Sequence, residues 1–218
     1  MIPVSTADPG HEPSGGLRER KKVATRHALG IAAMRLAIRH GLDNVLVEDI
    51  AEAAGVSART FNNYFASKYE AICALDFDRA MRIGGALREQ PDGEPIWTAI
   101  TNAVMSEYGQ AERVLDEEWM AGVRLVTSAP ALRGEYLKVQ AVMQYSLADA
   151  IAARLGSAPA TSMFPPILAA AVMAALQAAR DRWLHADPPV PLAPLVRKAL
   201  RELAAGMRQV LPQPADSG

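Results

Sequence analysis

Apolar residues recur along most of this chain at steps of three and four, the spacing that gathers them on one face of a helix. Ala, Leu, Arg, Met and Glu dominate these segments, and none alternates apolar and polar residues as a strand would. Turn residues interrupt the pattern at Gly41, at 90–95, at 156–166 and at 187–191. The pattern predicts an all-α protein with about nine helices.

The first predicted helix, at about 18–40, combines an apolar face with a basic start. The apolar face is formed by Leu29, Ala32, Ala33, Leu36 and Ala37. The basic residues at its start are Arg18, Arg20, Lys21, Lys22 and Arg26. A charged helix face is commonly just solvated, so this run becomes informative only through its position before the next motif.

Residues 47–64 read VEDIAEAAGVSARTFNNY, which is the spacing of a helix-turn-helix. A small residue at Ala51 lets the second helix approach the first, and Gly55 can take the positive φ of a tight turn. Ser57 can cap the second helix by accepting a backbone N–H bond. Ile50, Ala54, Val56, Phe61 and Tyr64 are the apolar positions, and we expect Ile50, Phe61 and Tyr64 to face the core. The alternative is a helical hairpin with an ordinary polar face.

The exposed side of the second helix suits DNA. Asn can form two hydrogen bonds to an adenine edge and Arg two to guanine, while basic and hydroxyl groups bind phosphates. The predicted DNA-binding residues are Lys22, Arg26, Val47, Ser57, Ala58, Arg59, Thr60, Asn62, Asn63, Tyr64 and Lys68. Residues 17–68 hold nine Lys or Arg and five Asp or Glu, a formal charge of +4 in a chain of −1. This local basic charge favours a nucleic-acid partner.

The segment EDIAEAAGVSARTFNNYFASK resembles the TetR family of regulators over about 45 residues, from Thr25 to Lys68. The matching positions are Gly41, Val47, Gly55-Val56-Ser57, Tyr64-Phe65 and Ser67-Lys68. The chain departs from the family pattern at Leu46, where a Thr is frequent, and at Leu36-Ala37, where Leu-Phe is usual.

The resemblance implies a homodimer that binds a near-palindromic operator in double-stranded DNA. It also implies an effector-binding body in which a small molecule changes the spacing of the two reading heads. Most relatives repress and some activate. We therefore expect a disordered arm at 1–16, a three-helix helix-turn-helix DNA-binding domain at 17–66, a helical effector-binding and dimerisation domain at 67–211, and a tail at 212–218.

Two C-terminal segments are candidates for the dimer interface. Residues 192–211 place apolar side chains at steps of three and four, and residues 166–184 are apolar nearly all round. Two such helices from each subunit can form a four-helix interface, and a two-fold protein can read two half-sites. The alternative is a monomer core. The predicted interface residues are Ala170, Ala174, Leu195, Ala199 and Leu203.

The middle of the chain, at about 95–155, is rich in aromatic residues and methionines, which suit an adaptable apolar pocket. Each of them can also be plain core packing. The predicted effector pocket comprises Trp97, Met105, Tyr108, Trp119, Met120, Met143 and Tyr145, with Arg124, Glu118 and Gln144 as possible polar anchors. We expect a mostly apolar effector.

Other functional classes have less support in the sequence. A single cysteine, Cys73, and no long apolar run favour a soluble cytoplasmic protein without a membrane partner. The histidines are scattered and no phosphate-binding loop or nucleophile elbow is visible, so we expect no enzyme, metal or cofactor. The acidic run 116–118 is interpreted as a solvated face and Cys73 as inert packing rather than a redox sensor. A helical protein-interaction or lipid-carrier module remains the third possibility.

Overall fold

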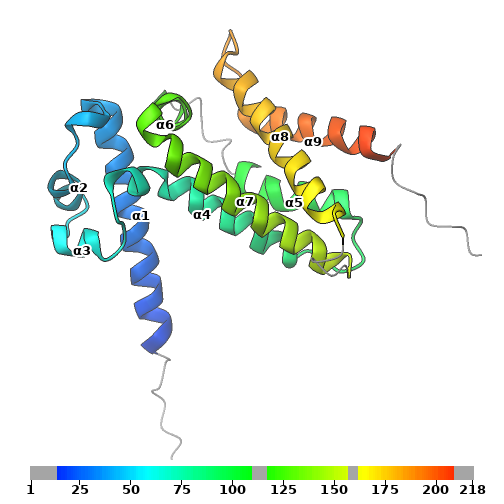
Figure 1. Ribbon diagram of the computed structural model, residues 1–218, viewed down its shortest axis with the longest axis horizontal. Helices are drawn as coiled ribbons and strands as arrows, with labels where there is room; N and C mark the ends of the chain where they lie inside the picture. Colours follow the sequence, from blue (N-terminus) through cyan, green and yellow to red (C-terminus); the bar gives the residue numbers. More distant parts are fainter. Residues whose placement is uncertain (1–13, 110–116, 157–161, 209–218) are drawn as a thin grey trace, which may run out of the picture.

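Figure 1 shows the computed structural model, which describes residues 14–109, 117–156 and 162–208. Those residues form nine α-helices and no strand, which confirms the predicted fold class. The first helix, α1 (Ser14–His40), begins inside the segment that the sequence predicted to be disordered. The prediction relied on the prolines, glycines and few apolar residues of 1–16, and such composition does not fix where a helix begins. Residues 1–13 and the predicted tail lie outside the described residues.

Three short elements follow α1 and pack against it. They are η1 (Leu42–Asn44), α2 (Val47–Ala53) and α3 (Ala58–Asn62). Their contacts are centred on an apolar cluster that we call the N-terminal core. It includes Leu29, Ala33, Ile50, Phe61, Phe65 and Ile72, all fully or almost fully buried. The predicted apolar face of α1 is therefore the face that holds the helix-turn-helix.

The remaining six α-helices form the body. They are α4 (Lys68–Arg88), α5 (Ile96–Tyr108), α6 (Glu117–Ser128), α7 (Arg133–Arg154), α8 (Phe164–Leu184) and α9 (Leu192–Arg208), with η3 (Pro130–Leu132) before α7. Figure 1 shows α1–α3 at one end, α8 and α9 at the other, and α4 and α7 running between them. None of the described helices is long and apolar enough to cross a membrane.

Helix α4 contributes to two separate cores. Its first turns place Ala71, Ile72 and Ala74 in the N-terminal core. Its second half places Ile83 and Leu87 in the core of the body, together with buried residues of α5, α7, α8 and α9. Because one rigid helix is packed into both clusters, a displacement of α4 in the body moves the surface on which the helix-turn-helix rests.

A glycine sets how closely α4 and α7 approach each other. A Cβ built on Gly84 would collide with the Ser146 hydroxyl and lie 3.1 Å from Ser146 Cβ and 3.4 Å from its carbonyl oxygen. Rotating the hydroxyl relieves only the first contact. The close crossing of these two helices therefore requires glycine at position 84.

We predict that Gly84→Ala lowers the free energy of unfolding by about 1–3 kcal/mol, because overpacking forces the helices apart. The neighbouring Gly85→Ala is the matched control, since a Cβ there meets nothing within 4 Å. It should stabilise the protein by about 0.5–1 kcal/mol through helix propensity. Urea unfolding followed by circular dichroism measures both, and equal shifts in the two variants would contradict the close-approach argument.

Candidate nucleic-acid interface and ligand cavities

The turn between α2 and α3 has the geometry that the sequence predicted. Gly55 adopts a φ of 69°, and the Val56 N–H donates to the Ala51 carbonyl oxygen at 2.9 Å. Ala51 is buried at the crossing of the two helices, and Ile50 and Phe61 are fully buried on either side of it. Tyr64 is half-buried and packs at the edge of the same core.

Polar contacts fix both short helices at their starts. The Ser57 hydroxyl accepts from the Thr60 N–H at 3.1 Å and lies 2.9 Å from the Thr60 hydroxyl, which confirms the predicted cap. At α2, where Leu46 replaces the family's frequent Thr, the Leu46 N–H donates to Asp49 Oδ2 at 3.2 Å. Asp49 thus satisfies the Leu46 N–H, whereas the bond that a Thr side chain would accept from the first turn is missing, and the Leu46 side chain stays largely exposed.

The outer side of α3 presents the polar side chains expected to read bases. Arg59, Asn62 and Asn63 are all exposed, and Ala58 is half-buried beside them. Val47 is half-buried at the start of α2. Because these side chains are exposed, they are accessible to a partner molecule. Their role in DNA binding stays a prediction.

An open basic groove lies between the start of α1 and α3. It encloses about 710 Å³ and is lined by Arg18, Glu19, Lys21, Lys22, Thr25, Thr60, Asn63 and Tyr64. The three cations outnumber the single carboxylate, and the cationic side chains are exposed. The positive charge and the hydroxyl donors of this groove suit a phosphate backbone. Arg18, Lys21 and Thr25 were missing from the predicted site, although the basic run at 18–26 was the available signal.

Arg26 is turned inward and away from this groove. Its Nε pairs with Asp78 Oδ1 at 3.2 Å, its NH1 donates to the Tyr64 carbonyl oxygen at 3.4 Å, and its guanidinium lies 4.6 Å from the centre of the Phe65 ring. The arginine thus ties α1 to α4 and to the end of the helix-turn-helix. This geometry disfavours the predicted DNA contact, because the charge is already paired.

Lys68 is also occupied within the chain. Its Nζ donates to the carbonyl oxygens of Leu42 and Val45, each at 2.9 Å, and lies 3.4 Å from that of Asp43. An ammonium group has three protons, and all three point at this loop. Lys68 therefore holds the segment between α1 and α2 onto the start of α4, a geometry that disfavours the predicted phosphate contact.

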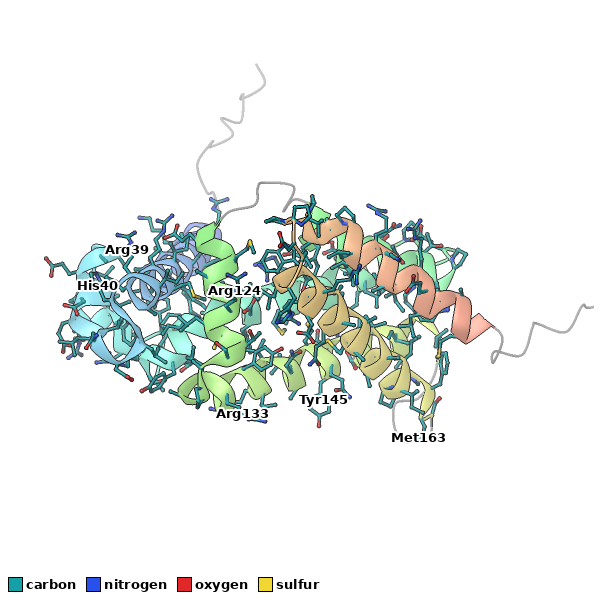
Figure 2. All side chains as sticks on the ribbon, turned by 90° about the horizontal axis from the view of Figure 1, so that it is seen from above. Arg39, His40, Arg124, Arg133, Tyr145 and Met163 are labelled. Carbon is teal, nitrogen blue, oxygen red and sulfur yellow. The ribbon has the colours of Figure 1, made fainter. Side chains whose placement is uncertain are left out.

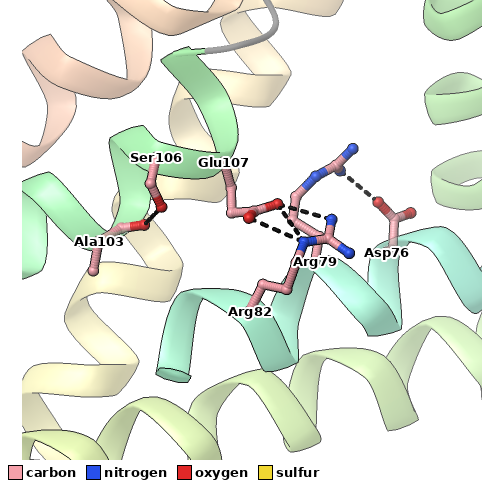
Figure 3. Close-up of polar contacts among 6 residues, drawn as sticks. All are labelled: Asp76, Arg79, Arg82, Ala103, Ser106 and Glu107. Carbon is pink, nitrogen blue, oxygen red and sulfur yellow. Dashed lines mark hydrogen bonds and ion pairs between the residues drawn. The ribbon is translucent and has the colours of Figure 1, made fainter. Parts of the chain in front are cut away.

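The body contains a small inner cavity between α4, α5, α7 and α8. Its volume is about 20 Å³, room for little more than one water molecule. Asp76, Arg79, Arg180, Tyr108, Tyr136, Gln140 and Met143 line it. Arg79 NH1 donates to Asp76 Oδ1 at 2.8 Å, and the neighbouring Arg82 pairs with Glu107 of α5 (Figure 3). Burial lowers the pKa of Arg79, but the charges of Asp76, Tyr108 and Glu107 and the hydrogen bond to Asp76 together outweigh burial, so the pKa is raised and the charge retained.

The predicted effector residues are not all gathered around this cavity. Tyr108 and Met143 line it, whereas Trp97, Met105 and Met120 pack against the body core. The Trp119 side chain lies outside what the structure describes. The prediction is wrong at Tyr145, which is 76% exposed and points away from α7 (Figure 2). Helix phase explains this, because Met143 and Leu147 take the inward positions and turn Tyr145 outward.

The suggested polar anchors have other partners. Arg124 donates to the Leu184 carbonyl oxygen at 3.2 Å, and Glu118 pairs with Arg35 at 3.3 Å. Gln144 is half-buried on α7. Cys73 is buried, and burial together with Asp76 and Glu135 raises its thiol pKa to about 12. This supports inert packing rather than redox sensing, which needs an accessible thiolate.

The candidate dimer residues lie on the outer side of α8 and along α9. Ala174 is exposed, and Ala170, Leu195, Ala199 and Leu203 are half-buried. On α8 the same face continues through Met163 and Ile167, which are 72% and 52% exposed. An exposed apolar stripe of this kind is typical of an interface, and its occupant stays a prediction.

We predict that Lys68→Met lowers the free energy of unfolding by about 1–3 kcal/mol, because loop carbonyls lose charge-assisted hydrogen bonds. The exposed Lys22→Met is the matched control and should change unfolding by less than about 0.5 kcal/mol. Thermal or urea unfolding measures both. An unchanged Lys68→Met variant would show that the ammonium does not hold the loop.

Both regions of the chain match models of known protein families. Residues 31–72 match the bacterial regulatory proteins of the tetR family, and residues 94–208 match the MftR C-terminal domain. The first match covers the helix-turn-helix and the second covers most of the body, from before α5 to the end of α9.

Individual proteins give the same assignment. The chain is 36% identical to the HTH-type transcriptional regulator TcmR of Streptomyces glaucescens, over 80% of either chain. It is 27% identical to MftR of Mycobacterium tuberculosis, assigned to the regulation of mycofactocin biosynthesis, over 86% of this chain and 93% of that one. The structure of the fatty acid degradation regulator FadR from Bacillus halodurans shares the fold, with a TM-score of 0.58, 19% identity and coverage of 84% and 96%. This chain therefore belongs to the TetR family of bacterial transcriptional regulators.

Proposed function

We propose that this regulator is a ligand-responsive repressor that binds a palindromic operator as a homodimer and is released by a small, mostly apolar effector. The observation that carries the proposal is the surface of α3, where Arg59, Asn62 and Asn63 are exposed beside the basic groove. Base-reading and phosphate-binding groups are adjacent there, as sequence-specific binding requires.

Side-chain chemistry separates the residues of this surface that would read bases from those that would bind phosphates. Asn62 and Asn63 carry both a donor and an acceptor, which match the adenine edge in the major groove, and Arg59 matches guanine. Lys21 and Lys22 on α1 carry only charge, so they would bind phosphates of any sequence and make affinity depend on salt. Helix α3 is held against the protein by Phe61, which fixes the orientation of the reading groups.

A dimer through α8 and α9 is supported by the exposed apolar stripe on α8. Ile167, Ala174 and Ala178 lie on one face, and the small alanines let a second helix approach closely. Pairing this face with its copy would bury it and place two copies of α3 on one side of the assembly. Two reading helices spaced by about one DNA turn would then select a palindrome.

Release by an effector requires that a ligand in the body change the position of α3. The shared helix α4 offers the route, since its two halves belong to the two cores. The inner cavity holds only about 20 Å³, so an effector entering between Tyr108 and Met143 would have to displace α4, α5 or α7. Such a displacement would change the separation of the reading helices in the dimer and weaken operator binding.

We predict that Asn63→Ala weakens operator binding by about 1–3 kcal/mol and relaxes the base preference at one position of each half-site. Asn102→Ala, an exposed asparagine on α5, is the matched control and should bind as the unmodified protein does. Fluorescence anisotropy on a set of single-base operator variants measures both quantities.

Lys22→Ala should instead weaken binding to all DNA sequences alike and reduce by about 1 the slope of log affinity against log salt concentration. If Asn62→Ala and Asn63→Ala both keep the base preference of the unmodified protein, α3 does not read the bases of the operator.

We predict that Ala174→Glu converts the dimer to a monomer, because the carboxylate would be buried without a partner at the α8 interface. Ala28→Glu introduces the same change at an exposed position of α1 and should leave the dimer intact. Light scattering coupled to size-exclusion chromatography gives the mass of each variant. A dimeric Ala174→Glu protein would move the interface away from this face of α8.

A further inference from the structure

The inner cavity between α4, α5, α7 and α8 carries an excess of positive charge in its wall. Arg79 of α4 and Arg180 of α8 are the cations among the described residues that line it, and Asp76 of α4 is the carboxylate. Arg79 and Asp76 pair with each other at 2.8 Å, so their charges offset. Two arginines against one aspartate leave the wall with a net charge of +1, which Arg180 carries.

Arg180 is the only half-buried arginine of the described residues that has no partner. Arg26 and Arg79 are each paired with a carboxylate, and Arg154 donates to three carbonyl oxygens of the loop at 90–94. Arg180 is half-buried like them, yet no ion pair, hydrogen bond or ring contact joins it to another described residue. Burial removes part of the hydration of a charged group, so an anion that reaches such a cation is bound favourably.

Hydrogen-bond donors complete the polar part of the wall. Tyr108 of α5 and both Tyr136 and Gln140 of α7 line the cavity. Gln140 Nε2 donates to the Tyr136 hydroxyl oxygen, so the proton of that hydroxyl is available to another acceptor. A guanidinium group binds a carboxylate with two parallel hydrogen bonds, and a phenolic hydroxyl can donate a further one. The polar part of the wall therefore suits the two oxygens of a carboxylate.

The size of the cavity limits what it can hold. At about 20 Å³ it has room for little more than one water molecule, which is enough for the polar end of a ligand but not for a whole effector. The remaining lining residues, Ala80, Val139 and Met143, are apolar and buried. Met143 also belongs to the body core, and its flexible thioether side chain can give up its place to an apolar group.

We propose that the inner cavity binds the carboxylate of an amphipathic monocarboxylic acid, with Arg180 as its counterion. The apolar remainder of the acid takes the place of the Met143 side chain against the body core. One negative charge balances the charge of the wall, whereas a dianion would bring a second charge into the cavity without a partner. The inference thus names the chemical class of the effector.

The position of the cavity connects such a ligand to both ends of the protein. Arg180 lies on α8, a helix of the proposed dimer interface, and Arg79 lies on α4 between the two apolar cores. In so small a cavity a bound carboxylate is within reach of both arginines and competes with Asp76 for Arg79. Binding would therefore displace α4 relative to α8. This consequence, but not the binding itself, rests on the proposed function.

The test uses octanoate as the probe and isothermal titration calorimetry of the full-length protein without DNA. We expect saturable binding that is about tenfold tighter than that of the neutral octanamide, because the amide lacks the charge. Acetate offers the carboxylate without the apolar chain and should bind at least about tenfold more weakly than octanoate.

Arg180→Gln should remove the preference for the acid over the amide, and Arg180→Lys, which keeps the charge, should retain most of it. Arg133→Gln replaces an exposed arginine of α7 that does not line the cavity, and this matched control is expected to bind normally. Circular dichroism confirms that each variant is folded.

The proposal is overturned if octanoate does not bind the unmodified protein, if octanoate and octanamide bind equally, if acetate binds as tightly as octanoate, or if Arg180→Gln keeps the preference for the acid. Because the titration contains no DNA, a failure of operator binding would refute the proposed function and leave this result standing.

Discussion

The double membership of α4 in two apolar cores is the constraint on which the rest of this structure depends. Ile72 is fully buried among side chains of α1 and the helix-turn-helix, and three turns later Ile83 is fully buried among helices of the body. Between them lie Asp76 and Arg79, paired with each other and bordering the inner cavity. A helix cannot bend cheaply over so short a distance, so the two cores move together.

The DNA-binding region was predictable from sequence because its determinants are local. Gly55 needs a positive φ, Ala51 must be small, and Ser57 must cap α3, and these requirements involve residues within a few positions of one another. The helical content of the body was predictable for the same reason. The C-terminal amphipathic pattern also predicted a helix at 192–211, and α9 (Leu192–Arg208) begins at the first residue of that pattern.

What the sequence did not reveal depends on contacts between distant segments. Arg26 and Lys68 look like phosphate ligands by residue type, yet their partners are Asp78 and the loop carbonyls of Leu42 and Val45. Tyr145 is an aromatic residue of the kind found in pockets, but it lies on the outer side of α7. Apolar and polar residues are mixed around this helix, so the sequence does not show which side faces inward. The close approach of Gly122 in α6 to Met34 in α1 joins residues 88 positions apart, which no local pattern records.

The central proposal is that the exposed face of α3, next to the basic groove of α1, reads a DNA sequence. A single measurement can test it. The measurement is selection of genomic DNA fragments by the purified full-length protein at two salt concentrations, followed by sequencing. We expect enrichment of a site with two-fold symmetry at both concentrations, with less DNA retained at the higher one. Retention that falls with salt but shows no preferred sequence would contradict it, since phosphate binding alone would then explain the surface.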